Sequence, residues 1–181
     1  MLVMGIDPSL VCTGLALMDF PTDKVEDGKL LKAEVFWLKT AVEVDESWIA
    51  ERIFDLCRDW VSKCAFIGIE DAVLTRSGFT FYRQALVIGG IRALIPAVHR
   101  SKVIAIKPTQ TKAAIGVHGI RTGAPKKGQP KIKPGMERRT KDEVVASCIR
   151  RYGDSLLPVQ RLRREAVCDA VGVACAAHLL S

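Results

Sequence analysis

The sequence predicts an α/β fold, in which a mixed five-stranded sheet has helices on both faces. Three observations support this prediction. Two short apolar runs near the N-terminus are joined by a turn, as in an antiparallel hairpin. Two later apolar runs are separated by a long helical pattern, as parallel strands are. A chain of 181 residues that is 49% hydrophobic can bury one sizeable core, so we expect a single domain over residues 1–181.

The predicted strands lie mostly in the N-terminal half. Residues 2–7 (LVMGID) and 11–19 (VCTGLALMD) are the apolar runs of the hairpin, and residues 30–40 alternate partly, which predicts a third antiparallel strand. Residues 65–70 (AFIGIE) and 102–107 (KVIAIK) complete the sheet. The segment 65–70 is apolar up to a final carboxylate, which is typical of a central strand whose end opens onto a site.

Apolar residues at helical spacing predict a surface helix over 47–63 and an almost wholly apolar helix over 79–98. The second has too little polar surface for an exposed helix, so we expect it to be buried in the domain or in a dimer interface. Further helices are predicted from 108 to 116, at about 139–152 and at about 163–180. Residues at about 117–137 combine Gly, Pro and Lys without apolar periodicity, which predicts a mobile basic loop.

The bulk composition narrows the classes of function. A net charge of +7 attracts polyanions, of which nucleic acid is the most common for a small protein. The six cysteines form no C-x-x-C pair, which argues against a zinc site and a disulfide scaffold. The N-terminus lacks the basic start of a signal peptide, and no run of about 18 apolar residues occurs, so we expect no membrane span and a cytoplasmic protein.

Three carboxylates far apart in the sequence stand out. Asp7 and Glu70 end predicted strands, and Asp169 lies inside an apolar helix, where an unpaired ionised carboxylate is costly. Each alone has an ordinary explanation, such as a turn cap, a strand exit or a salt bridge to an arginine. The ends of neighbouring strands, however, meet at one edge of a sheet, and a helix packed there can add the third acid.

Such a cluster predicts a metal-dependent nuclease. Three converging carboxylates repel one another unless a cation lies between them, and oxygen ligands without His or Cys favour Mg²⁺, with Mn²⁺ as a substitute. Two such ions can activate water for attack on a phosphodiester and stabilise the departing oxygen.

The same segments resemble the RuvC-type Holliday-junction resolvases, the crossover junction endodeoxyribonucleases. GIDPSLVCTGLAL resembles the first two strands of that family, IGIED the strand that ends in its second acid, and EAVCDAVGVACAAH its final helix. The resemblance spans almost the whole chain. It implies a ribonuclease-H-like fold, a homodimer, and Mg²⁺-dependent symmetric nicking of four-way DNA junctions in recombination or repair.

This sequence departs from the family's pattern at the position of the fourth metal ligand. The family places an acid or His three residues before the last Asp, a position that Ala166 occupies here. Glu165 lies four residues before Asp169 on the same helix face, so it can complete the metal site. A surface ion pair with Arg161 or Arg164 is the alternative, and both interpretations stay open. This departure and the lysine-rich loop suggest a diverged member of phage origin.

By the same resemblance, Lys112 and Lys141 correspond to two family lysines that contact DNA near the scissile phosphate, which assigns them to the catalytic site. Other basic residues cluster in and around the predicted loop. The alternative is a solvated insertion that aids solubility. The predicted DNA-binding residues are Arg76, Lys112, Arg121, Lys126, Lys127, Lys131, Lys133, Arg138, Arg139 and Lys141.

Three other functions compete. An ATP-binding protein of the actin and sugar-kinase type would need a second Gly-rich phosphate loop, which the sequence lacks. A ribonuclease-H-like nuclease of broader specificity, for RNA or branched DNA in general, would use the same acids and stays open. A junction-binding protein without catalysis is disfavoured because all three acids are present. The histidines (His99, His118, His178) are expected in surface or packing roles, and the tryptophans (Trp37, Trp48, Trp60) in core or helix-face positions without a base-stacking role.

Overall fold

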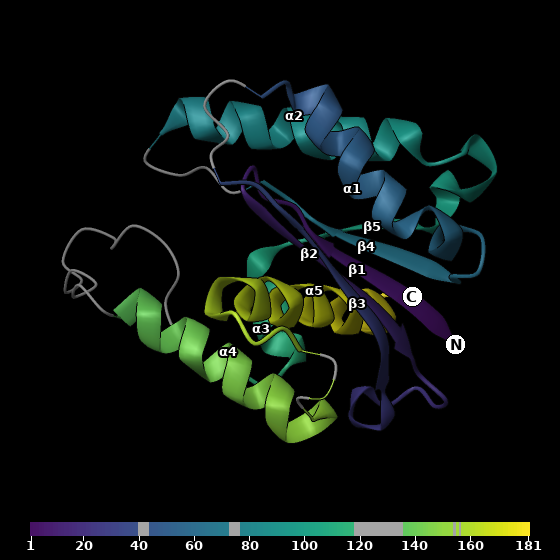
Figure 1. The fold of residues 1–181 in the computed structure, drawn as a ribbon. Coiled ribbons are helices and arrows are strands. Elements are labelled where there is room, and N and C mark those ends of the chain that lie inside the picture. The colour runs from purple at the N-terminus through teal and green to yellow at the C-terminus, as the bar shows by residue number, and fades with distance from the viewer. Residues whose placement is uncertain (40–43, 73–76, 118–135, 154, 156) are drawn as a thin grey trace, which may run out of the picture.

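The computed structural model describes residues 1–39, 44–72, 77–117, 136–153, 155 and 157–181, and in 136–140 the backbone alone. Within these ranges a five-stranded sheet lies between two layers of helices (Figure 1). The strands follow the order β3-β2-β1-β4-β5, and each predicted strand is confirmed. Their bounds are β1 (Leu2–Asp7), β2 (Cys12–Asp19), β3 (Lys29–Trp37), β4 (Phe66–Glu70) and β5 (Val103–Ile106). β2 is antiparallel to β1 and β3, whereas β4 is parallel to β1 and β5, so the sheet is mixed as predicted.

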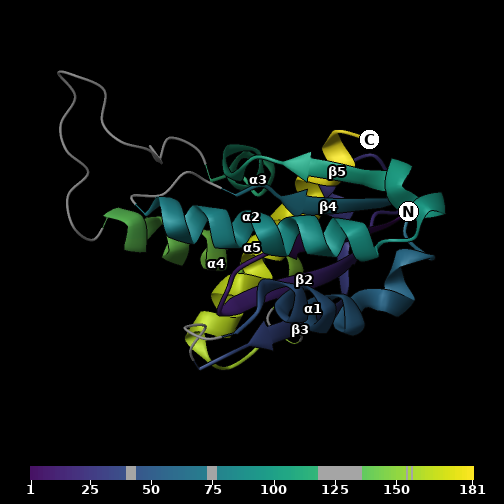
Figure 2. The same cartoon turned by 90° about the horizontal axis from the view of Figure 1, so that it is seen from above.

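Helices cover both faces of the sheet. α1 (Glu46–Val61) and α2 (Gly78–Leu94) lie side by side on one face, and α5 (Arg161–Leu179) crosses the other, with α3 (Pro108–Ala114) and α4 (Met136–Tyr152) beyond it (Figures 1 and 2). Two short 3₁₀ helices, η1 (Val25–Asp27) and η2 (Ala97–Lys102), complete the described elements. None of the helices in the described ranges is long and apolar enough to cross a membrane.

Two helix boundaries differ from the prediction by three residues or more. The helix predicted over 79–98 ends at Leu94, because Pro96 cannot continue it, and residues from Ala97 form η2 instead. The helix predicted from about 139 begins at Met136, just after Pro134 and Gly135 in the sequence. The rest of the predicted loop, residues 118–135, lies outside the described residues.

Alternate residues of each strand face different cores. In β1, Met4 and Ile6 pack in the core under α1 and α2, whereas Val3 packs in the core under α5. Because side chains alternate along a strand, Gly5 and Asp7 face α5 as well. The face of the sheet toward α5 is therefore the one to which the end of β1 presents its carboxylate.

Glycines let α5 lie directly on the central strands. A Cβ atom at Gly5 of β1 would stand 2.0 Å from the Ala170 carbonyl oxygen, and one at Gly14 of β2 would stand 1.9 Å from that of Ala166. At Gly68 of β4 a Cβ would meet Ala177 at 2.9 Å. The small residues of α5 and these three glycines thus bring helix and sheet backbones together. Asp169, between Ala166 and Ala170, is carried to the sheet by this close approach.

We expect Gly5→Ala to destabilise the protein by about 3 kcal/mol, because the added methyl overlaps the α5 backbone, which cannot yield as a flexible side chain can. Urea unfolding followed by circular dichroism measures the change. Gly78→Ala is the control, since a Cβ there meets nothing within 4 Å. A loss of stability in Gly5→Ala no greater than that of the control would contradict the close approach.

Candidate active site

The three predicted carboxylates come together at one edge of the sheet. Ile6 of β1 pairs with Ile69 of the parallel strand β4, so Asp7 and Glu70, the next residues, end adjacent strands side by side. Ile6 and Ile69 both pack under α1 and α2, which turns Asp7 and Glu70 to the α5 face. Asp169 of α5 reaches the same place over Gly5 and Gly14.

The pKa values of two of these acids reflect the crowding of negative charge. Burial raises the pKa of Asp7 well above its usual range, and the charges of Glu70 and Asp169 and a hydrogen bond shared with Glu70 raise it further. Burial and the charge of Glu70 raise the pKa of Asp169 to about 7, while Lys141 and Lys112 act in the opposite direction. The acids are thus close enough to repel one another, and the two lysines lie within electrostatic reach.

The donor set fits a hard divalent cation. Carboxylate oxygens are the ligands that Mg²⁺ and Mn²⁺ prefer, and burial together with mutual repulsion raises the pKa values of Asp7 and Asp169 despite the nearby lysines. In the described part of the chain, no three acidic, His or Cys side chains already stand close enough to hold an ion. Coordination by all three carboxylates therefore requires their side chains to turn toward a common point.

Glu165 is turned toward basic side chains. It is almost fully buried, accepts a hydrogen bond of 2.8 Å from Arg161 Nε and lies 3.5 Å from Lys141 Nζ. Arg161 also pairs with Asp142 at 2.7 Å, while Arg164 Nε donates to the Pro158 carbonyl oxygen. Of the two partners that the sequence offered for Glu165, Arg161 is the one in contact. A role of Glu165 as fourth metal ligand stays a prediction.

Two polar side chains that the sequence analysis missed contact this end of the sheet. Thr111 of α3 is buried, and its Oγ1 donates to Glu70 Oε1 at 3.0 Å. Gln84 of α2 donates from Nε2 to the carbonyl oxygen of Pro8, the residue after Asp7, at 2.8 Å. The only sequence signals were their positions: Thr111 directly precedes Lys112, and Gln84 is a polar residue inside an apolar helix.

We expect Thr111→Val to weaken Mn²⁺ binding about tenfold, because groups that orient a metal ligand typically contribute tenfold or more to affinity. Valine keeps the shape of threonine, including the methyl group that packs against Gly172, and removes only the donor to Glu70. Isothermal titration calorimetry measures the affinity, and Thr111→Ser, which keeps the hydroxyl, is the control. Equal affinities in the three proteins would show that the hydrogen bond does not orient Glu70 for metal.

Most of the predicted DNA-binding residues lie outside the residues that the structure describes. Lys112 and Lys141 lie beside the carboxylates, on α3 and α4. Arg138 and Arg139 lie in the first turn of α4, where only the backbone is described. The remaining residues, Arg76, Arg121, Lys126, Lys127, Lys131 and Lys133, lie outside the described residues.

The expectations for tryptophan and histidine are partly met. Trp60 is buried in the core under α1 and α2, and His178 is buried with its ring stacked on Phe20 at 4.1 Å. Trp48 lies on the first turn of α1 as a helix-face residue. Trp37, however, is neither in the core nor on a helix face. It ends β3 as a partly exposed side chain, because the strand runs out there at the rim of the sheet.

Comparisons with known proteins identify the fold. No protein-family model matches the chain, and no curated protein matches it. T. thermophilus RuvC in complex with a Holliday junction substrate aligns with a TM-score of 0.62 and 19% identity, over 97% of this chain and 91% of that one. A second structure of T. thermophilus RuvC aligns with a TM-score of 0.63 and 21% identity, over 97% of this chain and 92% of that one. Fowlpox virus resolvase in complex with Holliday junction DNA aligns with a TM-score of 0.57 and 14% identity, over 96% of this chain and 94% of that one. The chain has the ribonuclease-H-like fold of the RuvC resolvases.

Proposed function

We propose that this chain, built on the fold of the RuvC resolvases, is a divalent-metal-dependent endodeoxyribonuclease that nicks four-way DNA junctions in recombination or repair. The observation that carries the proposal is the meeting of Asp7, Glu70 and Asp169, from two strand ends and one helix, with Lys112 and Lys141 beside them. Structural neighbours from T. thermophilus and fowlpox virus were solved with Holliday junction DNA, which supports the substrate.

The residues divide into metal-holding and phosphate-holding groups. Asp7, Glu70 and Asp169 would hold Mg²⁺, with Glu165 as a fourth ligand once it leaves Arg161. When bound, the metal would supply a Lewis acid and activate water. Lys112 and Lys141 would anchor the phosphate and stabilise its developing negative charge. The buried Thr111 would hold the Glu70 carboxylate in place.

The remaining predicted arginines and lysines would extend the DNA contact beyond the cut. Arg76, Arg138 and Arg139, and the loop residues Arg121, Lys126, Lys127, Lys131 and Lys133, would hold phosphates of the junction arms. We place this activity in the cytoplasm, since all six cysteines are free.

A substrate panel tests the proposal. A labelled four-way junction, a linear duplex and an RNA–DNA hybrid are each incubated with Mg²⁺, with Mn²⁺ and with EDTA. We expect symmetric nicks in opposing strands of the junction with either metal, and none with EDTA. Failure to cut the junction in metal would refute the proposal, and preferred cutting of the hybrid would favour the broader ribonuclease-H-like alternative.

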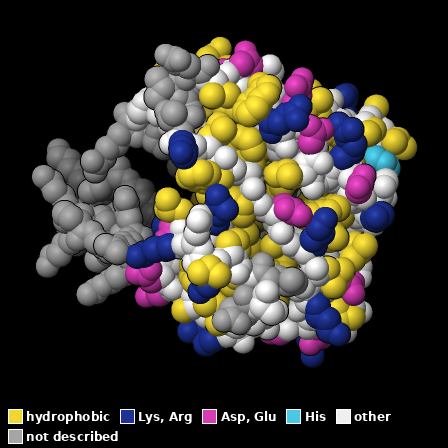
Figure 3. Space-filling model, in the orientation of Figure 1, with side chains coloured by type: hydrophobic (Ala, Val, Ile, Leu, Met, Phe, Trp, Pro, Cys, Tyr) yellow, Lys and Arg dark blue, Asp and Glu magenta, His cyan; other side chains and the backbone are white. Residues whose placement is uncertain are grey.

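A homodimer through α2 would place two such sites on one junction. Phe79, Tyr82, Leu86 and Gly89 follow one stripe of α2, and the first three are 71%, 60% and 43% exposed. A Cβ at Gly89 would meet nothing within 4 Å, although glycine costs a helix interior about 1 kcal/mol relative to alanine. Close approach of a partner helix explains both features, and two-fold symmetry suits a four-way junction. Hydrophobic side chains are also visible over α1 and α2 at the top of Figure 3.

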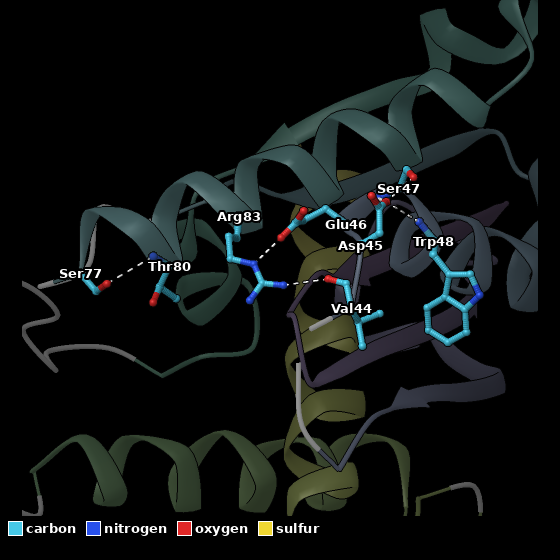
Figure 4. Close-up of polar contacts among 8 residues, drawn as sticks. All are labelled: Val44, Asp45, Glu46, Ser47, Trp48, Ser77, Thr80 and Arg83. Carbon is cyan, nitrogen blue, oxygen red and sulfur yellow. Dashed lines mark hydrogen bonds and ion pairs between the residues drawn. The ribbon is translucent and has the colours of Figure 1, made fainter. Parts of the chain in front are cut away.

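The first turns of α2 are fixed to α1, so the stripe is held outward. Arg83 of α2 forms an ion pair with Glu46 of α1 and donates from Nη2 to the Val44 carbonyl oxygen at 2.9 Å (Figure 4). Its guanidinium carbon also lies 5.7 Å from the Phe79 ring centroid. This network leaves α2 with little freedom to turn its apolar side chains inward.

We expect Leu86→Glu to convert a dimer into monomers, because it places a charge in the centre of the apolar stripe. Sedimentation velocity at micromolar concentration measures the oligomeric state. Leu180→Glu, at an exposed position after α5, is the control and should leave the dimer intact. A wild-type protein that sediments as a monomer, or a Leu86→Glu dimer, would contradict the α2 interface.

A further inference from the structure

Trp37 lies on the same face and at the same end of the sheet as the carboxylates. In β3, Phe36 packs in the core under α1 and α2 and Val35 packs against the core under α5, so the next side chain, Trp37, faces α5. β3 ends where β1 ends, because each of these strands is antiparallel to β2. Trp37 therefore shares its surface with Asp7 and Glu70.

The register of the strands gives the separation between Trp37 and Asp7. Asp7 pairs with Gly14 and Gly14 with Val35, which places Trp37 two strands across and two residues along from Asp7. At strand spacings of about 4.8 Å and a rise of about 3.3 Å per residue, the Cα atoms are about 12 Å apart. One DNA strand covers this distance in about three to four nucleotides.

An arginine without a salt bridge lies on the Trp37 ring. The guanidinium carbon of Arg163 is 5.0 Å from the ring centroid. Its neighbours Arg161 and Arg164 are engaged by Glu165, Asp142 and Pro158. In the part of the chain that the structure describes, Arg163 has no acidic partner, and its buried Nε has no hydrogen-bond acceptor. The pair thus presents an aromatic ring and a cation that no described acid neutralises.

Arg163 and Lys141 both act on the surface between this pair and the carboxylates, where Glu165 adds one negative charge. Cys12 of β2 pairs with Trp37 in register, and its Sγ lies 3.6 Å from the Leu162 carbonyl oxygen of α5. Burial raises the pKa of the Cys12 thiol, while the charges of Arg163 and Lys141 lower it. Lys141 also acts on Asp169. Arg163 and Lys141 therefore flank the path from Trp37 to the metal site.

We propose that Trp37 and Arg163 form a stacking platform for a base of the cleaved DNA strand, about three to four nucleotides from the scissile phosphate. This proposal rests on the proposed nuclease function. Bases that are unstacked from their neighbours can stack on aromatic rings and guanidinium planes irrespective of sequence. The exposed ring accepts the base, and the guanidinium attracts the strand that carries it.

Junction binding by Asp7→Asn protein, which leaves the DNA uncut, tests the platform. We expect Trp37→Ala to weaken binding about tenfold or more, Arg163→Ala to weaken it and reduce its salt dependence, and Trp37→Phe to retain most of the affinity. Trp48→Ala is the matched control. Trp48 is 42% exposed against 39% for Trp37, but packs against Phe36 on the opposite face. Its replacement should not change the affinity.

Tryptophan fluorescence provides a second readout that a purely structural role would not affect. Junction DNA should quench the emission of wild-type protein and of Trp48→Phe, but quench that of Trp37→Phe much less. Equal junction affinity of Trp37→Ala and Trp48→Ala, or undiminished quenching in Trp37→Phe, overturns the platform and leaves junction cleavage by the wild type intact. A wild type that neither binds nor cuts a junction overturns both proposals.

Discussion

Replacing Asp7 by Asn should slow junction cleavage by at least about 10³-fold, because it removes a charged ligand from the centre of the proposed metal site. Asp7 has the position for this role at the end of β1, where Glu70 and Asp169 both act on its pKa. Asparagine has nearly the same shape and carries no negative charge, so junction affinity should stay within about threefold of wild type or increase. Single-turnover cleavage and an electrophoretic binding assay separate the two effects.

Asp71→Asn is the matched control for this experiment. Asp71 follows Glu70 at the same edge of the sheet, but its carboxylate pairs with Arg92 of α2 at 3.0 Å. The control should cut junctions at close to the wild-type rate. If Asp7→Asn cuts as fast as Asp71→Asn, the catalytic assignment of the carboxylate cluster is wrong.

Asp169→Asn should stabilise the metal-free protein at pH 8, and on the proposed function it should also abolish activity. Burial and the charge of Glu70 raise the pKa of Asp169 to about 7 in the folded protein, from 3.8 for an ordinary aspartate. A folded pKa above the unfolded value means that the folded state binds more protons between pH 4 and 7. Wild-type stability therefore falls as the pH rises through this window, by about 1–3 kcal/mol from this group. Asparagine removes that cost.

Thermal unfolding in EDTA at pH 5 and pH 8 measures this effect. The melting temperature of Asp169→Asn should exceed that of wild type by about 3–8 °C at pH 8, and by much less at pH 5. Added Mn²⁺ should raise the melting temperature of wild type alone, because only an intact carboxylate set binds the ion. A variant less stable than wild type at pH 8 would show that Asp169 does not carry an unfavourable charge in the folded state.

The sequence was sufficient to predict those parts of the fold and of the candidate site that depend on local sequence pattern. Alternation and apolar runs predicted all five strands, and the ends of residues 2–7 and 65–70 predicted where Asp7 and Glu70 would meet. Asp169 was noticeable because a charge inside an apolar helix is costly. These inferences hold because the period of the pattern and the cost of a buried charge are properties of the chain itself.

The helix ends show the limit of such reasoning. The apolar pattern continued from residue 79 to 98, but Pro96 ended the helix at Leu94. An almost wholly apolar helix also could not show whether its outer side chains meet their own core or another molecule. For Glu165 the spacing allowed two orientations. The hydrogen bond from Arg161, four residues earlier on α5, and the ion pair with Lys141 of α4 determine which orientation Glu165 adopts here.

By itself, then, the sequence determined the strands, the helices and the three acids, because each leaves a mark within a few residues. Only the tertiary structure determined that Thr111 holds Glu70, that Gln84 holds the Pro8 carbonyl, and that Trp37 stands under Arg163 on the face of the carboxylates. Each of these contacts joins residues at least 41 apart in the chain. The contact between Trp37 and Arg163 arises because three glycines let α5 settle on the sheet, and no local pattern records which surfaces the packing of helices on the sheet brings together.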